Sequence, residues 1–137
     1  MPFTLHPTLA RDTVEVARLP LCRALLMNDR RFPWLILVPE REGIREIHEL
    51  PPADRAALIE EIARAGEALR RLFQPDKLNM GALGNIVPQL HVHVVARAAG
   101  DPAWPGPVWG SGAAVPYSEG EIEEARARLA AALARTG

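Results

Sequence analysis

Two histidines preceded by a glutamine form the pattern that points most directly to chemistry. The segment Gln89-Leu-His91-Val-His93-Val-Val alternates polar and apolar residues. Residues two apart on a β-strand share a face, so we expect Gln89, His91 and His93 on one side of a strand. The intervening residues Leu90, Val92 and Val94 would face the core. Two imidazoles on one strand face indicate a functional site rather than an ordinary polar surface.

Two kinds of chemistry use such a pair of imidazoles. Both can ligate zinc, but a zinc site needs at least one more protein ligand, and Cys22, His6 and His48 are scattered without motif spacing. Alternatively, a neutral imidazole is a nucleophile near pH 7 and can attack phosphorus, forming a phosphoramidate that water then cleaves. The residues alone leave both chemistries open.

The segments around the motif predict an α+β domain. Alternation and short apolar runs predict strands at about 13–19, 21–27, 34–38, 77–83 and 90–98. Apolar residues at helical spacing predict one long helix at about 53–73 and a C-terminal helix at about 118–135. Ser118 and Glu121 have the spacing of a capping box at the start of the second helix. We therefore expect a five-stranded, mostly antiparallel sheet with two helices.

Two segments are expected to be irregular. Prolines at positions 2 and 7 interrupt the chain up to about residue 12, and residues 100–117 are rich in proline and glycine. The second segment also carries Trp104 and Trp109, which could close over a bound base or pack against a partner subunit. Long irregular loops of this kind are often functional.

Length and composition fit one globular domain over residues 1–137. The chain is 48% hydrophobic and 24% charged, which excludes bulk disorder. A net charge of −1 gives no support to nucleic-acid binding, and no apolar run is long enough to span a membrane. Cys22 is the only cysteine, so an intrachain disulfide is excluded and a cytoplasmic location is favoured.

The segment Gln89–Val95 resembles the motif of the histidine triad (HIT) family, His-φ-His-φ-His-φ-φ, in which φ is apolar. Leu25-Leu-Met-Asn28 and Pro33-Trp-Leu-Ile-Leu-Val-Pro39 are similar to the first hairpin of that family, and the helix at 53–73 is similar to its long helix. The resemblance covers about residues 13–97 and implies a HIT-like fold.

The resemblance implies a nucleotide hydrolase or transferase that attacks the α-phosphate of diadenosine polyphosphates or adenosine phosphoramidates. It implies that His91 is the nucleophile, that His93 hydrogen-bonds the phosphoryl region, and that Gln89 orients the site. Substrate contacts are implied at Asn28, at the ribose, and at Asn79, Gly84 and Asn85, near the nucleotide and its phosphates. It further implies a homodimer and a core reaction that needs no metal or other cofactor.

Three positions depart from the family pattern. Gln89 stands in place of the first histidine of the motif and cannot carry a proton as an imidazole does. Trp34 lies near the place where the second strand often opens with a histidine. Ile86 replaces a serine or threonine that assists the leaving group. A nucleotide-binding protein with weak or lost catalysis is therefore one alternative, and a metalloenzyme with His91 and His93 as ligands is another.

Overall fold

The computed structural model describes residues 2–135, and its centre is one antiparallel sheet with the strand order β1-β2-β3-β5-β4. The strands are β1 (Thr13–Arg18), β2 (Cys22–Met27), β3 (Trp34–Pro39), β4 (Lys77–Gly81) and β5 (Val92–Arg97). The helical elements are α1 (Pro7–Asp12), the 3₁₀ turn η1 (Ile47–Glu49), α2 (Pro52–Phe73) and α3 (Glu119–Arg135). This arrangement confirms the predicted α+β class with a five-stranded sheet.

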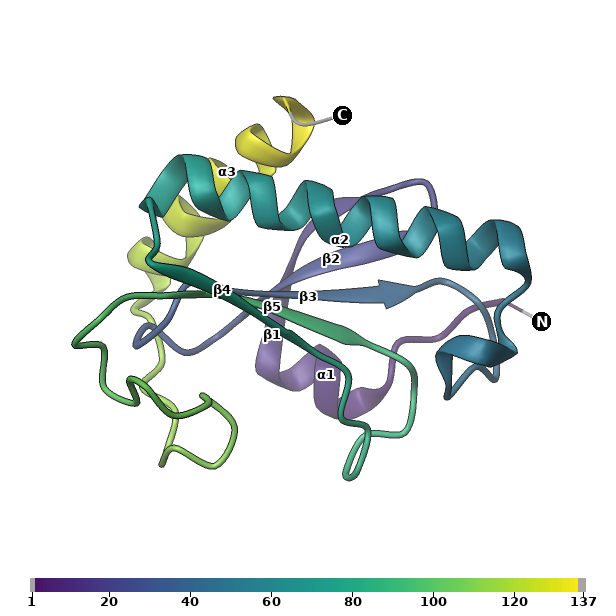
Figure 1. Cartoon of the computed structure of the whole chain (residues 1–137), viewed down its shortest axis with the longest axis horizontal. Helices are drawn as coiled ribbons and strands as arrows, with labels where there is room; N and C mark the ends of the chain where they lie inside the picture. The colour runs from purple at the N-terminus through teal and green to yellow at the C-terminus, as the bar shows by residue number, and fades with distance from the viewer. Residues whose placement is uncertain (1, 136–137) are drawn as a thin grey trace.

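Helices α2 and α3 cover one face of the sheet, while α1 and the connection between β5 and α3 lie on the other side (Figure 1). The helix side holds a core built from leucines of both helices and from alternate residues of the strands. The carboxylate of Glu61 on α2 accepts hydrogen bonds from the backbone N–H groups of Leu21 and Cys22, each at 2.8 Å. This buried clamp fixes α2 against the start of β2.

The second face of the sheet, which carries the histidines, is also buried. Its cover is a smaller apolar cluster, formed by Leu9, Leu25, Phe32, Trp34, Ile36, Val38, Val87, Val95 and Val108. All six residues of β3 are consequently buried. Residues that were predicted to look outward from β5 therefore sit beneath a second layer of side chains.

Helix α1 is the element that the sequence pattern missed. The chain before residue 12 was expected to be irregular, yet Pro7 stands at the first position of this helix. Proline is favoured there because its missing N–H needs no partner and its fixed φ suits a helix. The ring of His6 caps the helix, since its Nδ1 accepts from the N–H of Thr8 at 3.1 Å.

Within residues 2–135, no helix has both the length and the apolar character needed to cross a membrane.

Candidate active site

The imidazole of His91 has one defined tautomer. Its Nδ1 lies 2.7 Å from the backbone carbonyl oxygen of Gln89, and a carbonyl oxygen can only accept. Nδ1 therefore carries the hydrogen, and Nε2 presents a lone pair. The residue is 6% exposed and lines a cavity of about 410 Å³. A buried ring with a bare nitrogen beside a cavity has the form of a nucleophile.

His93 is held in the opposite tautomer. The indole Nε1–H of Trp34 donates to His93 Nδ1 at 3.0 Å, so the hydrogen of the neutral ring sits on Nε2. Burial, together with the neighbouring His91, lowers the pKa of His93 to about 4. The two imidazole rings lie 4.9 Å apart, edge to face. With both rings neutral, the pair thus combines an acceptor nitrogen on His91 with an N–H donor on His93.

Trp109, from the connection between β5 and α3, packs against His93 and Trp34. Its ring centre lies 5.3 Å from that of His93 and 6.5 Å from that of Trp34. Gly81 on β4 makes room for it, because a Cβ at that residue would lie 3.0 Å from the Trp109 ring. The sequence left open what Trp104 and Trp109 do. Trp109 packs against His93, whereas the Trp104 ring lies under the guanidinium of Arg97.

Gln89 does not lie on the strand as predicted, and neither does His91, because β5 begins at Val92. The carboxamide of Gln89 binds the N-terminal segment instead. Oε1 accepts from the backbone N–H of His6 at 2.8 Å, and Nε2 donates to the carbonyl oxygen of Thr4 at 2.9 Å. Gln89 also lines the cavity beside His91. Gln89 therefore contacts two neighbours: its side chain binds the N-terminal segment, and its backbone carbonyl binds His91.

The turn after β4 lies partly beside the cavity. Gly84 lines the cavity together with His91, and its φ of +75° is one that glycine adopts without strain. Asn85 follows it in the same turn and is exposed. Sequence reasoning missed the opposite wall, which holds Arg45, His48 and Arg55. Nothing in their spacing marks them, since Arg45 precedes η1, His48 lies in η1 and Arg55 lies near the start of α2, all far from the motif in sequence.

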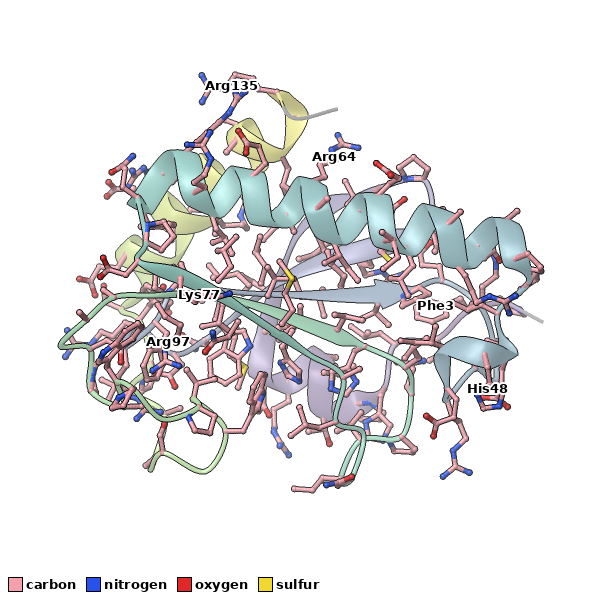
Figure 2. All side chains as sticks on the ribbon, in the orientation of Figure 1. Phe3, His48, Arg64, Lys77, Arg97 and Arg135 are labelled. Carbon is pink, nitrogen blue, oxygen red and sulfur yellow. The ribbon has the colours of Figure 1, made fainter. Side chains whose placement is uncertain are left out.

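Asn28 and Asn79 are not part of this cavity. The side-chain oxygen of Asn28 accepts from the backbone N–H of Tyr117 at 2.9 Å, which fastens the β2–β3 turn to the segment before α3. The side-chain oxygen of Asn79 accepts from the guanidinium of Arg97 at 2.8 Å. Arg97 lies at the opposite end of the molecule from His48 in Figure 2. Both asparagines make structural contacts in this arrangement.

Among residues 2–135, no group of three or more His, Cys, Asp or Glu side chains is placed to hold a metal ion. The scattered third ligands that the sequence offered, Cys22, His6 and His48, are thus not assembled around the two histidines.

Comparisons with known proteins agree with this architecture. Residues 9–100 match the sequence model described as the HIT domain. A histidine triad protein from Marinobacter aquaeolei VT8 is 47% identical, with complete coverage of both chains and a TM-score of 0.96. A HIT protein from Sinorhizobium meliloti 1021 is 53% identical, with a TM-score of 0.91 over 93% of this chain and 94% of the other.

A curated relative from Mycobacterium tuberculosis, named AP-4-A phosphorylase, is 30% identical over 107 residues. The match covers 73% of this chain and 55% of that protein, so the chain spans about half the length of the curated relatives it matches.

Proposed function

Because the chain belongs to the HIT domain family, we propose that it transfers the nucleotidyl group of a purine nucleotide substrate through His91. The lone pair on Nε2 attacks the α-phosphorus, an N–P bond forms, and the bond from phosphorus to the leaving oxygen breaks. Water then attacks the same phosphorus, the N–P bond breaks, and the ring returns to its starting form. The nucleoside monophosphate leaves with the oxygen of that water.

The observation that carries this proposal is the tautomer of His91. The hydrogen bond from Nδ1 to the Gln89 carbonyl oxygen leaves Nε2 bare, so no proton has to be removed before attack. As the N–P bond forms, the ring becomes positively charged, and the same carbonyl dipole stabilises that charge. His93 supports the reaction as a neutral donor, because its Nε2–H can bind an oxygen on phosphorus.

The leaving group that suits this site is a polyphosphate. Gln89 replaces the first histidine of the motif, and its carboxamide is engaged with the N-terminal segment. Ile86 is 88% exposed and has no hydroxyl to give. Neither side chain can deliver a proton, and an amine departs only when protonated, whereas a phosphate oxygen can depart as an anion. Diadenosine polyphosphates are thus favoured over phosphoramidates.

Two further observations support a polyphosphate. Arg45 and Arg55 line the same cavity as His91, and their positive charges can attract the phosphate groups of the substrate. The M. tuberculosis relative carries the name of an enzyme acting on AP-4-A. A phosphorylase uses phosphate instead of water. The name of this relative therefore suggests phosphate as an alternative second nucleophile for the present chain.

The test compares the wild-type protein with His91→Ala. We expect the wild type to cleave a diadenosine polyphosphate faster than an adenosine phosphoramidate, and mass spectra after an alkaline, denaturing quench to show one added adenylyl group, since the N–P bond is labile in acid. His91→Ala should lose turnover and the adduct while keeping its circular dichroism and melting temperature. Normal turnover in that variant would remove the mechanism.

A nucleotide-binding protein without turnover is the second candidate, and the replacements at Gln89 and Ile86 are the observations that favour it. It predicts saturable AMP binding by calorimetry with no cleavage of either substrate. A metalloenzyme is the third outcome of the same assay, recognised by stoichiometric zinc in the purified protein and by activity that a chelator abolishes.

We propose in addition that the chain forms a homodimer through β4. This strand is one edge of the sheet, and an edge strand offers unpaired N–H and C=O groups to a second chain. Exposed apolar side chains lie on β4 and the turn after it, at Met80, Leu83 and Ile86. Since Leu83 also lines the His91 cavity, dimer formation would place the partner near the site.

Sedimentation velocity tests the dimer. Ile86→Asp should yield monomers at micromolar concentration, whereas Ile59→Asp, at a 62% exposed position on α2, should leave the dimer intact. A wild-type monomer, or a dimer that survives Ile86→Asp, would contradict this assembly.

A further inference from the structure

The N-terminal arm, residues 2–6, lies against the side of the sheet that carries the histidines. Phe3 and Leu5 pack on the smaller apolar cluster, and the guanidinium of Arg23 stands 5.3 Å above the ring of Phe3. In Figure 2, Phe3 lies toward the end of the molecule that carries His48 and away from Arg97. The arm has no strand partner, so something else must satisfy its backbone.

That partner is the side chain of Gln89. In a β-ladder, the carbonyl of one residue and the N–H of the residue two further on point to the same neighbour. Thr4 and His6 stand in this relation around Leu5, and the carboxamide of Gln89 meets both groups, at 2.9 and 2.8 Å. It takes the place of the N–H and C=O of one residue in a missing neighbouring strand. A carboxamide offers an acceptor and a donor side by side, which suits this double contact.

The backbone of Gln89 holds the candidate nucleophile. Its carbonyl oxygen accepts from His91 Nδ1 at 2.7 Å, and the N–H of the same peptide unit, on Leu90, donates to Ile44 O at 3.0 Å. Gln89 lies before β5, which begins at Val92, so no hydrogen bonds of the β-sheet fix its backbone. Its position therefore depends on two anchors, Ile44 through the main chain and the arm through the side chain.

We infer that Gln89 is a positioning residue that couples the docking of the N-terminal arm to the orientation of His91. Undocking the arm frees the Gln89 side chain and loosens the carbonyl that fixes the His91 ring. The inference rests on the proposed function for its kinetic consequence. Its structural part, arm to Gln89 to His91 ring, stands on the two sets of hydrogen bonds alone.

Gln89→Ala is the first variant, because it removes the carboxamide and keeps the backbone carbonyl. We expect the His6 amide to exchange about 10- to 100-fold faster, since two hydrogen bonds of the arm are lost. The ¹⁵N shifts of the His91 ring should move from a fixed Nδ1–H form toward an average of both tautomers. kcat for a diadenosine polyphosphate should fall about tenfold, with KM changed much less.

His6→Pro attacks the same contact from the arm. The φ of His6 is −54°, which proline adopts readily, so the change removes the N–H that Gln89 accepts from without distorting the backbone. His6→Ala is its matched control, because alanine keeps that N–H and, like proline, lacks the ring that caps α1. We expect His6→Pro to reproduce the ring shifts and kcat of Gln89→Ala, and the double variant to add nothing further.

Gln74→Asn provides a distant control, since Gln74 also binds a backbone carbonyl with its carboxamide, at the end of α2. Gln89→His asks whether an imidazole can replace the amide, and we expect it to release the arm. Faster exchange of the His6 amide with unchanged His91 ring shifts would overturn the coupling, and so would additive effects in the double variant. If no nucleotide is turned over, the proposed function fails while the exchange and ring measurements still decide this inference.

Discussion

The indole Nε1–H of Trp34 donates to Nδ1 of His93 across 3.0 Å, and this contact decides which ring nitrogen of His93 carries the hydrogen. Trp34 opens β3, and His93 lies on the adjacent β5. A tryptophan is only ever a donor, so His93 is restricted to presenting Nε2–H elsewhere. A bulky apolar residue thereby sets the chemistry of a polar one.

Trp34→Phe should release this restriction. Without the indole donor, either ring nitrogen of His93 can carry the hydrogen, while burial and the neighbouring His91, which lower the pKa of His93 to about 4, are unchanged. Both tautomers should then appear in long-range ¹H–¹⁵N spectra, and kcat should fall several-fold. Trp104→Phe, which alters the packing at Arg97, should leave the His93 spectrum unchanged. An unaltered His93 tautomer in Trp34→Phe would refute the assignment.

Stability should fall on acidification because of His93. The pKa of this ring is about 4 in the folded protein and ordinarily 6.5, so between these pH values the unfolded chain binds the proton and the folded protein does not. The free energy of unfolding should therefore decline as pH drops from about 6.5 to about 4, by at most about 3 kcal/mol. Chemical denaturation of wild type and His93→Gln at several pH values isolates this contribution. Parallel pH curves for the two proteins would argue against a neutral, buried His93.

Gly81→Ala tests the packing of Trp109 against His93. The added Cβ would lie 3.0 Å from the indole, so Trp109 must move and the variant should lose about 1–2 kcal/mol of stability. Tryptophan emission should shift to longer wavelength as the ring becomes hydrated. Gly120→Ala is the matched control, because its Cβ meets open space on α3 and should raise helix stability. Equal effects at both glycines would show that Trp109 is not confined.

Arg97 is a buried cation whose removal should be costly. It is 1% exposed, pairs with Asp101 at 2.8 Å and donates to Asn79. Arg97→Met leaves the Asp101 carboxylate without its cation, and we expect a loss of about 3–5 kcal/mol. The pKa of Asp101, which Arg97 lowers to about 2, should rise in the same variant. Arg126→Ala breaks an exposed pair with Glu123 and should cost well under 1 kcal/mol. Urea unfolding of both variants makes the comparison.

The helices were predictable because their signals are local. The spacing of Leu58, Leu69 and similar residues gave α2 to within a residue, and Ser118 and Glu121 do form the capping box, with Glu121 N donating to Ser118 Oγ at 3.3 Å. Such patterns depend on neighbours in the chain and need no knowledge of the rest of the fold.

The start of β5 was not predictable from alternation. Leu37 pairs with Val92, and continuing that register would bring Leu90 opposite Pro39, which has no N–H to donate. The ladder stops, Leu90 turns its N–H to Ile44, and Gln89 leaves the strand. The start of β5 is set by Pro39 on the partner strand, so the sequence of residues 89–92 does not indicate it. The Trp34–His93 contact was missed for the same reason, since it joins residues 59 positions apart.

The carboxamide of Gln89 determines how the attachment of the N-terminal arm responds to pH. An amide neither gains nor loses a proton in the pH range where proteins stay folded. The two hydrogen bonds from Gln89 to residues 4–6 therefore keep the same strength from mildly acidic to alkaline solution. An imidazole in place of the carboxamide would change charge near neutral pH and lose one of the two hydrogen bonds to the arm backbone. The substitution gives up a proton carrier and gains an attachment that is indifferent to pH.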